Sequence, residues 1–443
     1  MSGLKQKLLF GSFWALSGKI LMIMLAMVLN MVLARLLSPE DMGAYFISLA
    51  VVVTVAAFAQ VGMNQAIVRL IAEGMAKGSF SYVRKAVFFA IQITLIGSGV
   101  LGFIIYVGVG DWLARDVFDL PVMNTILGLL VLWVFGRGLQ DILAECFRGF
   151  HSIGLATFFG GLFSTAVSVF FCLYVYVQYK SVDLNLAIKL IVLAFVINAV
   201  LAMVFVYKRL PEKSIDASFD KMKVVRLAFP LWGSALISMI LVQLDVWVVG
   251  IAASAIDVAM YGAAIKLVML VSMPLMIVNA VVPPIIAEYH SNDNITVLEN
   301  TLRSMTSIAT LSSLVIMFVF ILQGDYFLGL VYGEGYKGSA QILSILCLGH
   351  AFSVWAGACG FALNMTGHQK SLLKIMIVTL ILALLASYPA AKYFGVLGVA
   401  TVTSGWLILL HGWALIETKR KIGVWTHAHW NPFVITEALK KVG

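Results

Sequence analysis

Long apolar runs dominate the pattern of this chain. The first, from Phe10 to Ala34, contains one charged residue, Lys19, and runs of similar length and polarity recur about eleven more times. The hydrocarbon core of a bilayer is about 30 Å thick, and a helix crosses it with about 20 apolar residues. The pattern therefore predicts an all-α polytopic membrane protein whose spans are separated by short polar turns.

The runs predict twelve transmembrane helices. Turn and capping residues mark some of the starts, since Ser38-Pro39-Glu40 opens the second run and Leu120-Pro121 precedes the fourth. The expected spans are residues 10–36, 41–66, 84–109, 122–147, 153–178, 184–207, 227–251, 258–283, 303–323, 338–364, 372–391 and 395–416.

Basic residues are distributed unevenly over the predicted turns. With the N-terminus inside, most of the 30 Lys and Arg residues fall in cytoplasmic segments, and Lys19 and Lys266 fall inside spans. The basic residues on the outer side are Arg35, Arg115, Lys180, Lys189, Lys337 and Lys392. This asymmetry predicts that both termini lie in the cytoplasm.

The two halves of the chain have similar patterns. The polar stretch Tyr207–Lys223 divides the spans six and six, and the ending Ile71-Ala72-Glu73 of one helix corresponds to Ile286-Ala287-Glu288 in the other half. Because each half starts inside and has an even number of spans, the halves are expected to be parallel repeats. We expect two pseudo-symmetric six-helix bundles around a central cavity. Their expected ranges are 1–207 and 227–416, with a cytoplasmic linker at 208–226 and a cytoplasmic amphipathic tail at 417–443.

Composition argues against a soluble or a nucleic-acid-binding protein. The 443 residues are 62% hydrophobic and 12% charged, and the net charge of +9 collects beside apolar helices instead of on a soluble basic face. The first span is too long for a signal peptide and lacks a small-residue cleavage site, so we interpret it as an uncleaved anchor. We expect no disulfide, metal site or cofactor, because metal-ligand spacing is lacking among the cysteines, which are Cys146, Cys172, Cys347 and Cys359.

One segment resembles a family signature. Residues 34–46, ARLLSPEDMGAYF, are similar to the ARLL(G/S)PEDFGxY signature of bacterial polysaccharide flippases, in the multidrug/oligosaccharidyl-lipid/polysaccharide exporter superfamily. Three further matches follow in order: RLIAE at 69–73, Phe229-Pro230 with the later Asp245, and NMTGH at 364–368. The resemblance covers nearly the whole chain. The two extra C-terminal helices usual in peptidoglycan-precursor flippases are not expected here, which disfavours that specialisation.

The resemblance implies a transporter and no enzymatic activity. It implies a twelve-helix, two-bundle protein of the bacterial cytoplasmic (inner) membrane that flips undecaprenyl-diphosphate-linked oligosaccharide repeat units to the outer leaflet by alternating access. The expected partners are that lipid-linked substrate, membrane lipid and other glycan-assembly membrane proteins.

Cations inside the spans are the candidate ligands for such an anionic head group. Burying an unpaired anion in low dielectric costs on the order of tens of kcal/mol, so a wet, positively lined cavity is needed. Lys19, roughly 14 Å into the first helix, and Lys266 are candidates to line it. The alternative is structural pairing, for Lys266 with Asp245. Arg35 and Arg69 are candidates at the helix ends, where the alternative is anchoring at the membrane interface.

Acidic residues near the spans are candidates for coupling or gating. Arg137, Asp141, Glu145 and Arg148 approach one face of the fourth helix, where they could form a cytoplasmic gate or an internal salt-bridge ladder. Asp245, Asp141 and Glu145 are the acids that could carry a coupling proton or sodium ion. Outward movement of an anionic head is also favoured by an inside-negative potential.

Other residues have mainly structural interpretations. Pro230, Pro274 and Pro283-Pro284 are expected to bend their helices. His350 and His411 are expected to be satisfied polar residues of the bundle. Trp355 and Trp406 are expected to be packing or interface residues, with sugar stacking as the alternative.

Two other functions compete with flipping. A cation-coupled multidrug exporter would share the fold, but Lys19 would repel lipophilic cations. A membrane glycan polymerase or ligase would need a sizeable outer loop or domain, and every predicted outer loop is short.

Overall fold

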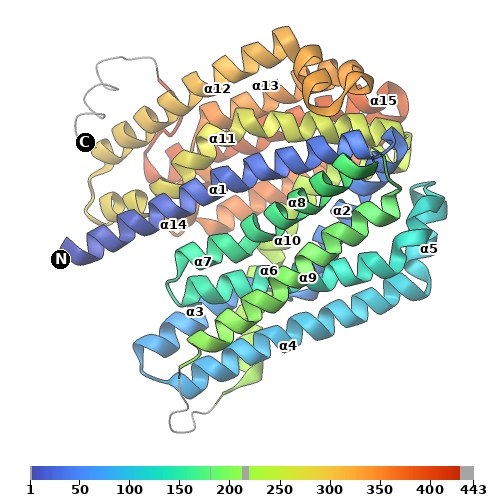
Figure 1. Ribbon diagram of the computed structural model, residues 1–443. Helices are drawn as coiled ribbons and strands as arrows, with labels where there is room; N and C mark the ends of the chain where they lie inside the picture. The colour runs from blue at the N-terminus through green and yellow to red at the C-terminus, as the bar shows by residue number, and fades with distance from the viewer. Residues whose placement is uncertain (1, 180, 212–218, 430–443) are drawn as a thin grey trace. The chain divides into compact units, whose positions relative to one another are not determined.

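The computed structural model describes residues 2–179, 181–211 and 219–429. These segments form helices joined by short turns and contain no strand. By internal contacts the chain divides into two compact units, residues 1–243 and 244–443 (Figure 1). We call them unit 1 and unit 2.

Unit 1 contains the N-terminal spans and several short 3-10 or π-helical segments, which are labelled η. Its helices are α1 (Ser2–Leu36), α2 (Pro39–Ala59), α3 (Met63–Ala76), α4 (Phe80–Ile104), η1 (Ile105–Val109), α5 (Gly110–Trp112), η2 (Leu113–Val117), η3 (Pro121–Ile126), α6 (Leu127–Gly149), α7 (Ile153–Thr157), η4 (Phe158–Leu162), α8 (Phe163–Tyr179) and α9 (Leu184–Arg209). The division between the units falls inside the next helix, α10 (Lys221–Ala252).

Unit 2 is built from fewer and longer helices. They are α11 (Ala255–Ser291), α12 (Ile295–Tyr332), η5 (Glu334–Ser339), α13 (Ala340–Ala356), α14 (Cys359–Met365) and α15 (Gln369–Ile422).

The length of α15 accounts for two crossings of a membrane. Over the described residues, 11 helical stretches are long and apolar enough to span a bilayer, and α15 is one of them. It has 54 residues, or about 80 Å at 1.5 Å per residue, which is more than twice the hydrocarbon thickness. Gly395 interrupts it with φ 61° and ψ −149°, backbone angles that are essentially open only to glycine. The prediction of about twelve spans in an all-α membrane protein is confirmed.

Two predicted spans end earlier than expected. The span expected at 41–66 stops at Ala59, and α3 is a separate helix beyond Val61 and Gly62, whose φ angles are 47° and 74°. A side chain at Gly62 would collide with the backbone of Ala228 on α10, so glycine allows both the left-handed turn and the close approach.

The second early end is in unit 2. The span expected at 338–364 stops at Ala356, because Gly357 adopts φ 76° before α14 begins. Gly357 packs against Thr306 and the carbonyl of Thr426, where a side chain would not fit. Neither break is marked by a proline in the sequence.

Proline does not end the helices that contain it. The α10 helix continues through Pro230, and α11 continues through Pro274 and Pro283-Pro284. Non-helical backbone angles inside long helical stretches occur instead at Gly161, Gln323 and Gly395. Bends at the predicted prolines are therefore not breaks of the helix.

The outer surface of the helices is strongly apolar. Large side chains such as Phe103, Phe170 and Tyr393 are 67%, 66% and 76% exposed. A water-facing surface rarely carries so many large apolar groups, whereas lipid accommodates them. Inside each unit, small residues let helices approach closely: Gly97 meets the Ala59 backbone and Gly349 meets Ser404.

The regions between and after the predicted bundles differ from the expectation in detail. Residues 208–209 still belong to α9, and α10 begins at Lys221 instead of residue 227. Residues 212–218 lie outside the described residues, as do residues 430–443, which include most of the predicted amphipathic tail. The assignment of the predicted domain boundaries to functional bundles stays a prediction.

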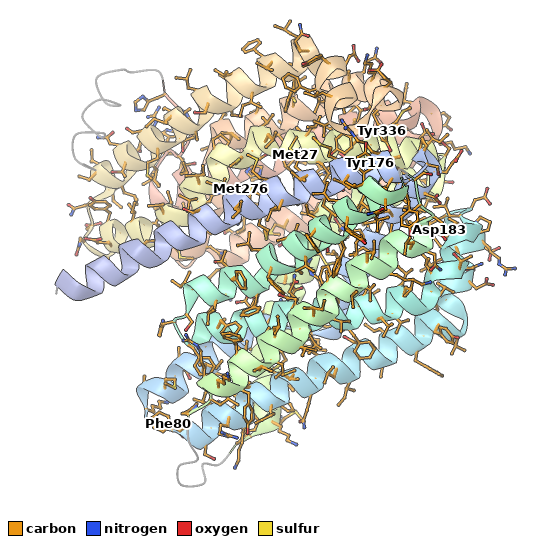
Figure 2. All side chains as sticks on the ribbon, in the orientation of Figure 1. Met27, Phe80, Tyr176, Asp183, Met276 and Tyr336 are labelled. Atoms are coloured by element: carbon orange, nitrogen blue, oxygen red, sulfur yellow. The ribbon has the colours of Figure 1, made fainter. Side chains whose placement is uncertain are left out.

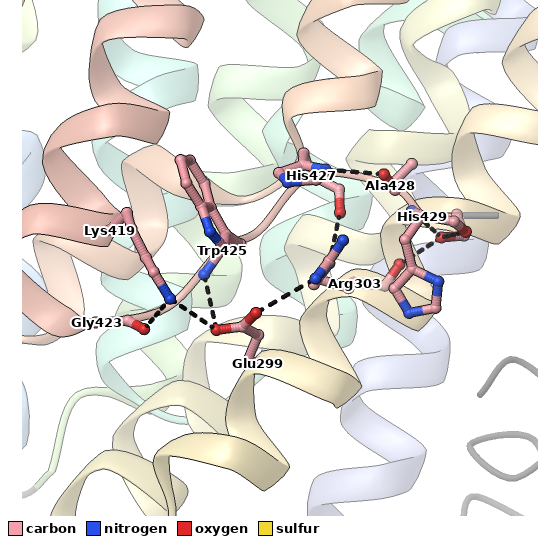
Figure 3. Close-up of polar contacts among 9 residues, drawn as sticks. Glu299, Arg303, Lys419, Gly423, Trp425, His427, Ala428 and His429 are labelled. Atoms are coloured by element: carbon pink, nitrogen blue, oxygen red, sulfur yellow. Dashed lines mark hydrogen bonds and ion pairs between the residues drawn. The ribbon is translucent and has the colours of Figure 1, made fainter. Parts of the chain in front are cut away.

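A non-helical strap follows α15. Residues 423–429, which we call the C-terminal strap, lie against α12 and α13 of unit 2 (Figure 3). The backbone of Ala428 donates to the carbonyl of Trp355 over 2.9 Å, and the Thr426 hydroxyl donates to the carbonyl of Ala356 over 2.7 Å. The strap thus covers the end of α13 at the break before α14.

Candidate functional site

Lys19 lies on an exposed face of α1. The neighbouring Gly18 packs against Thr157, and Met22 packs against Gly161, so one side of α1 meets α7 and η4. The Lys19 side chain is exposed and forms no ion pair with any described carboxylate. An unpaired cation inside an apolar helix is costly in lipid and is expected to serve a purpose there.

The charges of α6 are paired with one another. Arg137 Nε lies 3.1 Å from the Asp141 carboxylate, and both side chains are about 30% exposed. Gln60, at the break between α2 and α3, donates to the same carboxylate over 3.4 Å. Glu145 and Arg148 form a second ion pair one turn further on. The predicted salt-bridge ladder is therefore present as two separate pairs.

A buried polar cluster lies in unit 2 where α10, α11 and α15 meet. The Tyr261 hydroxyl donates to Asp245 over 3.3 Å and lies 3.0 Å from the Thr403 hydroxyl. The Asp245 carboxylate also accepts from the Val246 N–H over 2.8 Å. Lys266 lies close enough for its ammonium group to attract the Asp245 carboxylate. The structure thus brings together the two residues that the sequence left as an alternative pair.

The two membrane histidines have hydrogen-bond partners, as predicted. His350 Nδ1 lies 2.6 Å from the Ser272 hydroxyl, and His411 Nε2 lies 2.9 Å from the Ser353 hydroxyl. Trp355 stacks on His427 of the C-terminal strap at a ring distance of 5.1 Å. Its ring therefore has a protein partner, which supports packing over sugar stacking.

Arg35 and Arg69 lie at the ends of helices. Arg35 is exposed in the last turn of α1, where a cation interacts favourably with the helix dipole. Arg69 lies on α3 and forms an ion pair with Glu73 at 2.5 Å, with side chains 64% and 45% exposed. The hydrogen bond from Arg69 lowers the pKa of Glu73, and the charges of Lys77 and Lys223 act in the same direction.

Arg69 borders a hollow of about 750 Å³ in unit 1. The basic residues that line it are Arg69, Lys77, Lys223 and Arg226. Sequence reasoning identified only Arg69. The missed signal was an exposed row with a spacing of four residues, formed by Gln65, Arg69 and Glu73 of α3 and by Lys77 directly after it.

A second polar cluster fixes the C-terminal strap (Figure 3). The Glu299 carboxylate accepts from Arg303 over 3.3 Å and from Lys419 over 3.4 Å. It also accepts from the backbone N–H of Trp425 over 3.2 Å. These contacts join α12, α15 and the strap, so we interpret the cluster as structural.

Comparison with family models shows the family to which the chain belongs. A family model described as polysaccharide biosynthesis protein matches residues 8–290, well over half of the sequence. The chain belongs to the polysaccharide biosynthesis protein family. The chain also matches a second family model, MatE, over residues 230–388. No curated protein matches the sequence of this chain.

Solved structures show which fold the family member has. It is similar to an inward-facing multidrug resistance MATE family transporter of the MOP superfamily, with TM-score 0.76, 15% identity and coverage of 93% of this chain and 98% of that chain. For the lipid II flippase MurJ the TM-score is 0.70, with 15% identity and coverage of 96% and 90%. A MOP superfamily transporter from Pyrococcus furiosus gives TM-score 0.65, 16% identity and coverage of 95% and 96%. The chain therefore has the fold of this transporter superfamily.

Proposed function

We propose that this protein flips undecaprenyl-diphosphate-linked oligosaccharide repeat units from the inner to the outer leaflet of a bacterial cytoplasmic membrane. Transport proceeds by alternating access, with both termini in the cytoplasm and with no covalent step or cofactor. Membership of a polysaccharide biosynthesis family and the transporter fold support this proposal.

One observation about charge carries the choice of substrate. The carboxylates well inside the spans, Asp141 and Asp245, each have a cation close by, namely Arg137 and Lys266. Lys19 has no such counter-ion among the described carboxylates. Of the three charges considered, the one without a counter-ion is therefore the Lys19 ammonium group, which suits an anionic diphosphate and disfavours a lipophilic cation.

The other site residues have roles consistent with this proposal. Lys19 binds the anionic head during transport, Arg69 acts at the inner side and Arg35 at the outer side, while Lys266 balances the charge of Asp245. Asp245 and Tyr261 form the group best suited to respond to a coupling cation. The pairs Arg137–Asp141 and Glu145–Arg148 move with α6 as one charged face, and the contact from Gln60 to Asp141 is the one that breaks when α6 moves.

The competing functions make different demands. A multidrug exporter for cations requires an unpaired carboxylate in the spans, and both mid-span carboxylates have basic neighbours. A glycan polymerase or ligase requires a folded outer domain. The described turns between long helices are short, such as residues 253–254 between α10 and α11.

The decisive experiment follows the lipid-linked repeat unit. The gene is deleted, and the units are labelled in intact spheroplasts by a glycan-reactive reagent that does not cross the membrane. We expect unlabelled units to accumulate and labelling to return when the wild-type gene is restored. Normal labelling in the deletion strain would rule out the proposed function.

A further inference from the structure

The cationic hollow in unit 1 has a defined wall on three sides. It lies between α3, the turn to α4 and the first turns of α10, and Tyr82 and Leu227 add an apolar surface beside the charges. Tyr82 is held by Phe219 at a ring distance of 5.3 Å. The hollow therefore offers both positive charge and apolar contact within a fixed frame.

The two carboxylates that line the hollow, Glu73 and Asp220, already have an ion-pair or hydrogen-bond partner. Glu73 is paired with Arg69 at 2.5 Å. Asp220 caps α10, accepting hydrogen bonds from the N–H groups of Met222 and Lys223 over 2.9 and 3.1 Å. These contacts reduce the capacity of either carboxylate to neutralise the remaining cations.

Three cations of the hollow lack a close ion pair. Lys77, Lys223 and Arg226 are exposed, and none forms a salt bridge with a described residue. They stand around the N-terminus of α10, a helix of 32 residues whose dipole adds positive potential there. Such a group of cations attracts a ligand with more than one negative charge.

The position of the hollow fits uptake from the inner leaflet. Phe80 begins α4 beside the hollow, and Figure 2 shows it at the opposite end of unit 1 from Asp183. The asymmetry of basic residues predicts that the Phe80 end faces the cytoplasm. A volume of about 750 Å³ is within the usual range for small-molecule sites and leaves room for a diphosphate and an attached sugar.

We infer that this hollow is a docking site for the diphosphate of the lipid-linked glycan before transport. Lys77, Lys223 and Arg226 contact the phosphate oxygens, and Tyr82 contacts the first sugar. This assignment rests on the proposed function and adds to it a site separate from the cations inside the spans.

Binding to the full-length protein in nanodiscs of phosphatidylcholine tests the assignment. The probe is undecaprenyl diphosphate, and the variant is Lys77→Gln/Lys223→Gln/Arg226→Gln. The matched control, Lys370→Gln/Lys374→Gln/Lys421→Gln, removes the same charge from exposed positions on α15. We expect the first variant to bind at least about ten-fold more weakly and the control to bind within two-fold of wild type.

Competition identifies the source of the phosphate. Phosphatidylglycerol in the nanodisc should not displace undecaprenyl diphosphate at equal mole fraction. Equal displacement would overturn the diphosphate assignment in favour of a general anionic-lipid surface, and so would equal weakening in both triple variants. If the triple variant does not fold, the wild-type protein is acetylated with and without undecaprenyl diphosphate, and the probe should protect Lys77 and Lys223 from the reagent. Acetylation that the probe leaves unchanged overturns the proposal.

The binding experiment and the labelling experiment can fail independently of each other. Probe binding at the hollow together with normal labelling in the deletion strain would leave the docking site standing and remove the flippase function. Unchanged binding by the triple variant, with defective labelling in the deletion strain, would remove the docking site and leave the flippase function.

Discussion

The hydroxyl of Tyr261 donates a hydrogen bond of 3.3 Å to Asp245, and both side chains are almost wholly buried within unit 2. Tyr261 also contacts Thr403 at 3.0 Å. One phenol thus links α10, α11 and α15 at the position of Asp245, which is the only acidic residue of α10. Because a buried polar group without a partner is costly, these contacts are expected to contribute measurably to stability.

Replacing Tyr261 by phenylalanine should destabilise the protein. The change removes one donor and leaves Asp245 and Thr403 with fewer partners, at an expected cost of about 1–3 kcal/mol. Thermal unfolding in detergent measures it. Tyr336→Phe is the matched control, because the Tyr336 hydroxyl is buried without a described hydrogen-bond partner, so its removal should be neutral or stabilising. Equal losses in the two variants would contradict the role of the hydrogen bond.

Asp245 and Lys266 should show energetic coupling. Asp245→Asn leaves the Lys266 ammonium group without the neighbouring negative charge. Lys266→Met leaves the buried Asp245 carboxylate without a neighbouring cation. We expect the double variant to be more stable than the sum of the single changes predicts, by about 0.5–3 kcal/mol. Additive effects in a double-mutant cycle would show that the two charges do not interact.

The sequence identified the spans because hydropathy is a local property. A run of apolar residues such as Phe10–Ala34 predicts a helix whatever surrounds it. The breaks were not predictable in this way. The left-handed turn at Gly62, after the second span, fits closely against the backbone of Ala228, and that contact joins residues far apart in the sequence.

For the same reason, only part of the candidate site could be predicted from the sequence. Asp245 and Lys266 could be proposed as partners, since neighbouring spans carry them. Lys223 and Arg226 were read as part of a linker, yet they belong to α10 and join Arg69 at the hollow. Charge in a polar segment has no predicted neighbour until the helix that carries it is placed.

Gly395 should be less tolerant of a side chain than Gly405 of the same helix. No atom would obstruct a Cβ there, so the cost of Gly395→Ala comes from its backbone angles, at about 1–3 kcal/mol. Gly405 in the same helix also has open space but no positive φ, and Gly405→Ala should be neutral or stabilising. Thermal unfolding compares the two variants. A harmless Gly395→Ala would argue that α15 is not broken at this position.

The C-terminal strap should loosen in acid. Partial burial and the charge of Arg303 lower the pKa of His429 below its ordinary value of about 6.5. The unfolded strap then binds a proton more readily than the folded strap, so the contact is fully stable above that value and weakens as the pH falls below it. Proteolysis within the strap should be faster at pH 5.5 than at pH 7.5.

The control for this pH effect is a variant of the same residue. The backbone of His429 donates to Ser307 over 2.9 Å, and this bond survives a change of side chain. His429→Gln should therefore keep the strap in place and reduce the difference between the two pH values. An undiminished difference in that variant would assign the effect to another group.

Lys19 should be needed for transport and not for folding. Its ammonium group is exposed and unpaired among the described residues, so Lys19→Gln removes charge without leaving a partner behind. We expect glycan display at the cell surface to fall several-fold while the amount of protein in the membrane stays constant. Lys19→Arg should retain most of the display because it keeps the charge, and Lys421→Gln, at an exposed position late in α15, should have no effect. Unchanged display in Lys19→Gln would reduce Lys19 to a surface cation and remove the charge argument for an anionic substrate.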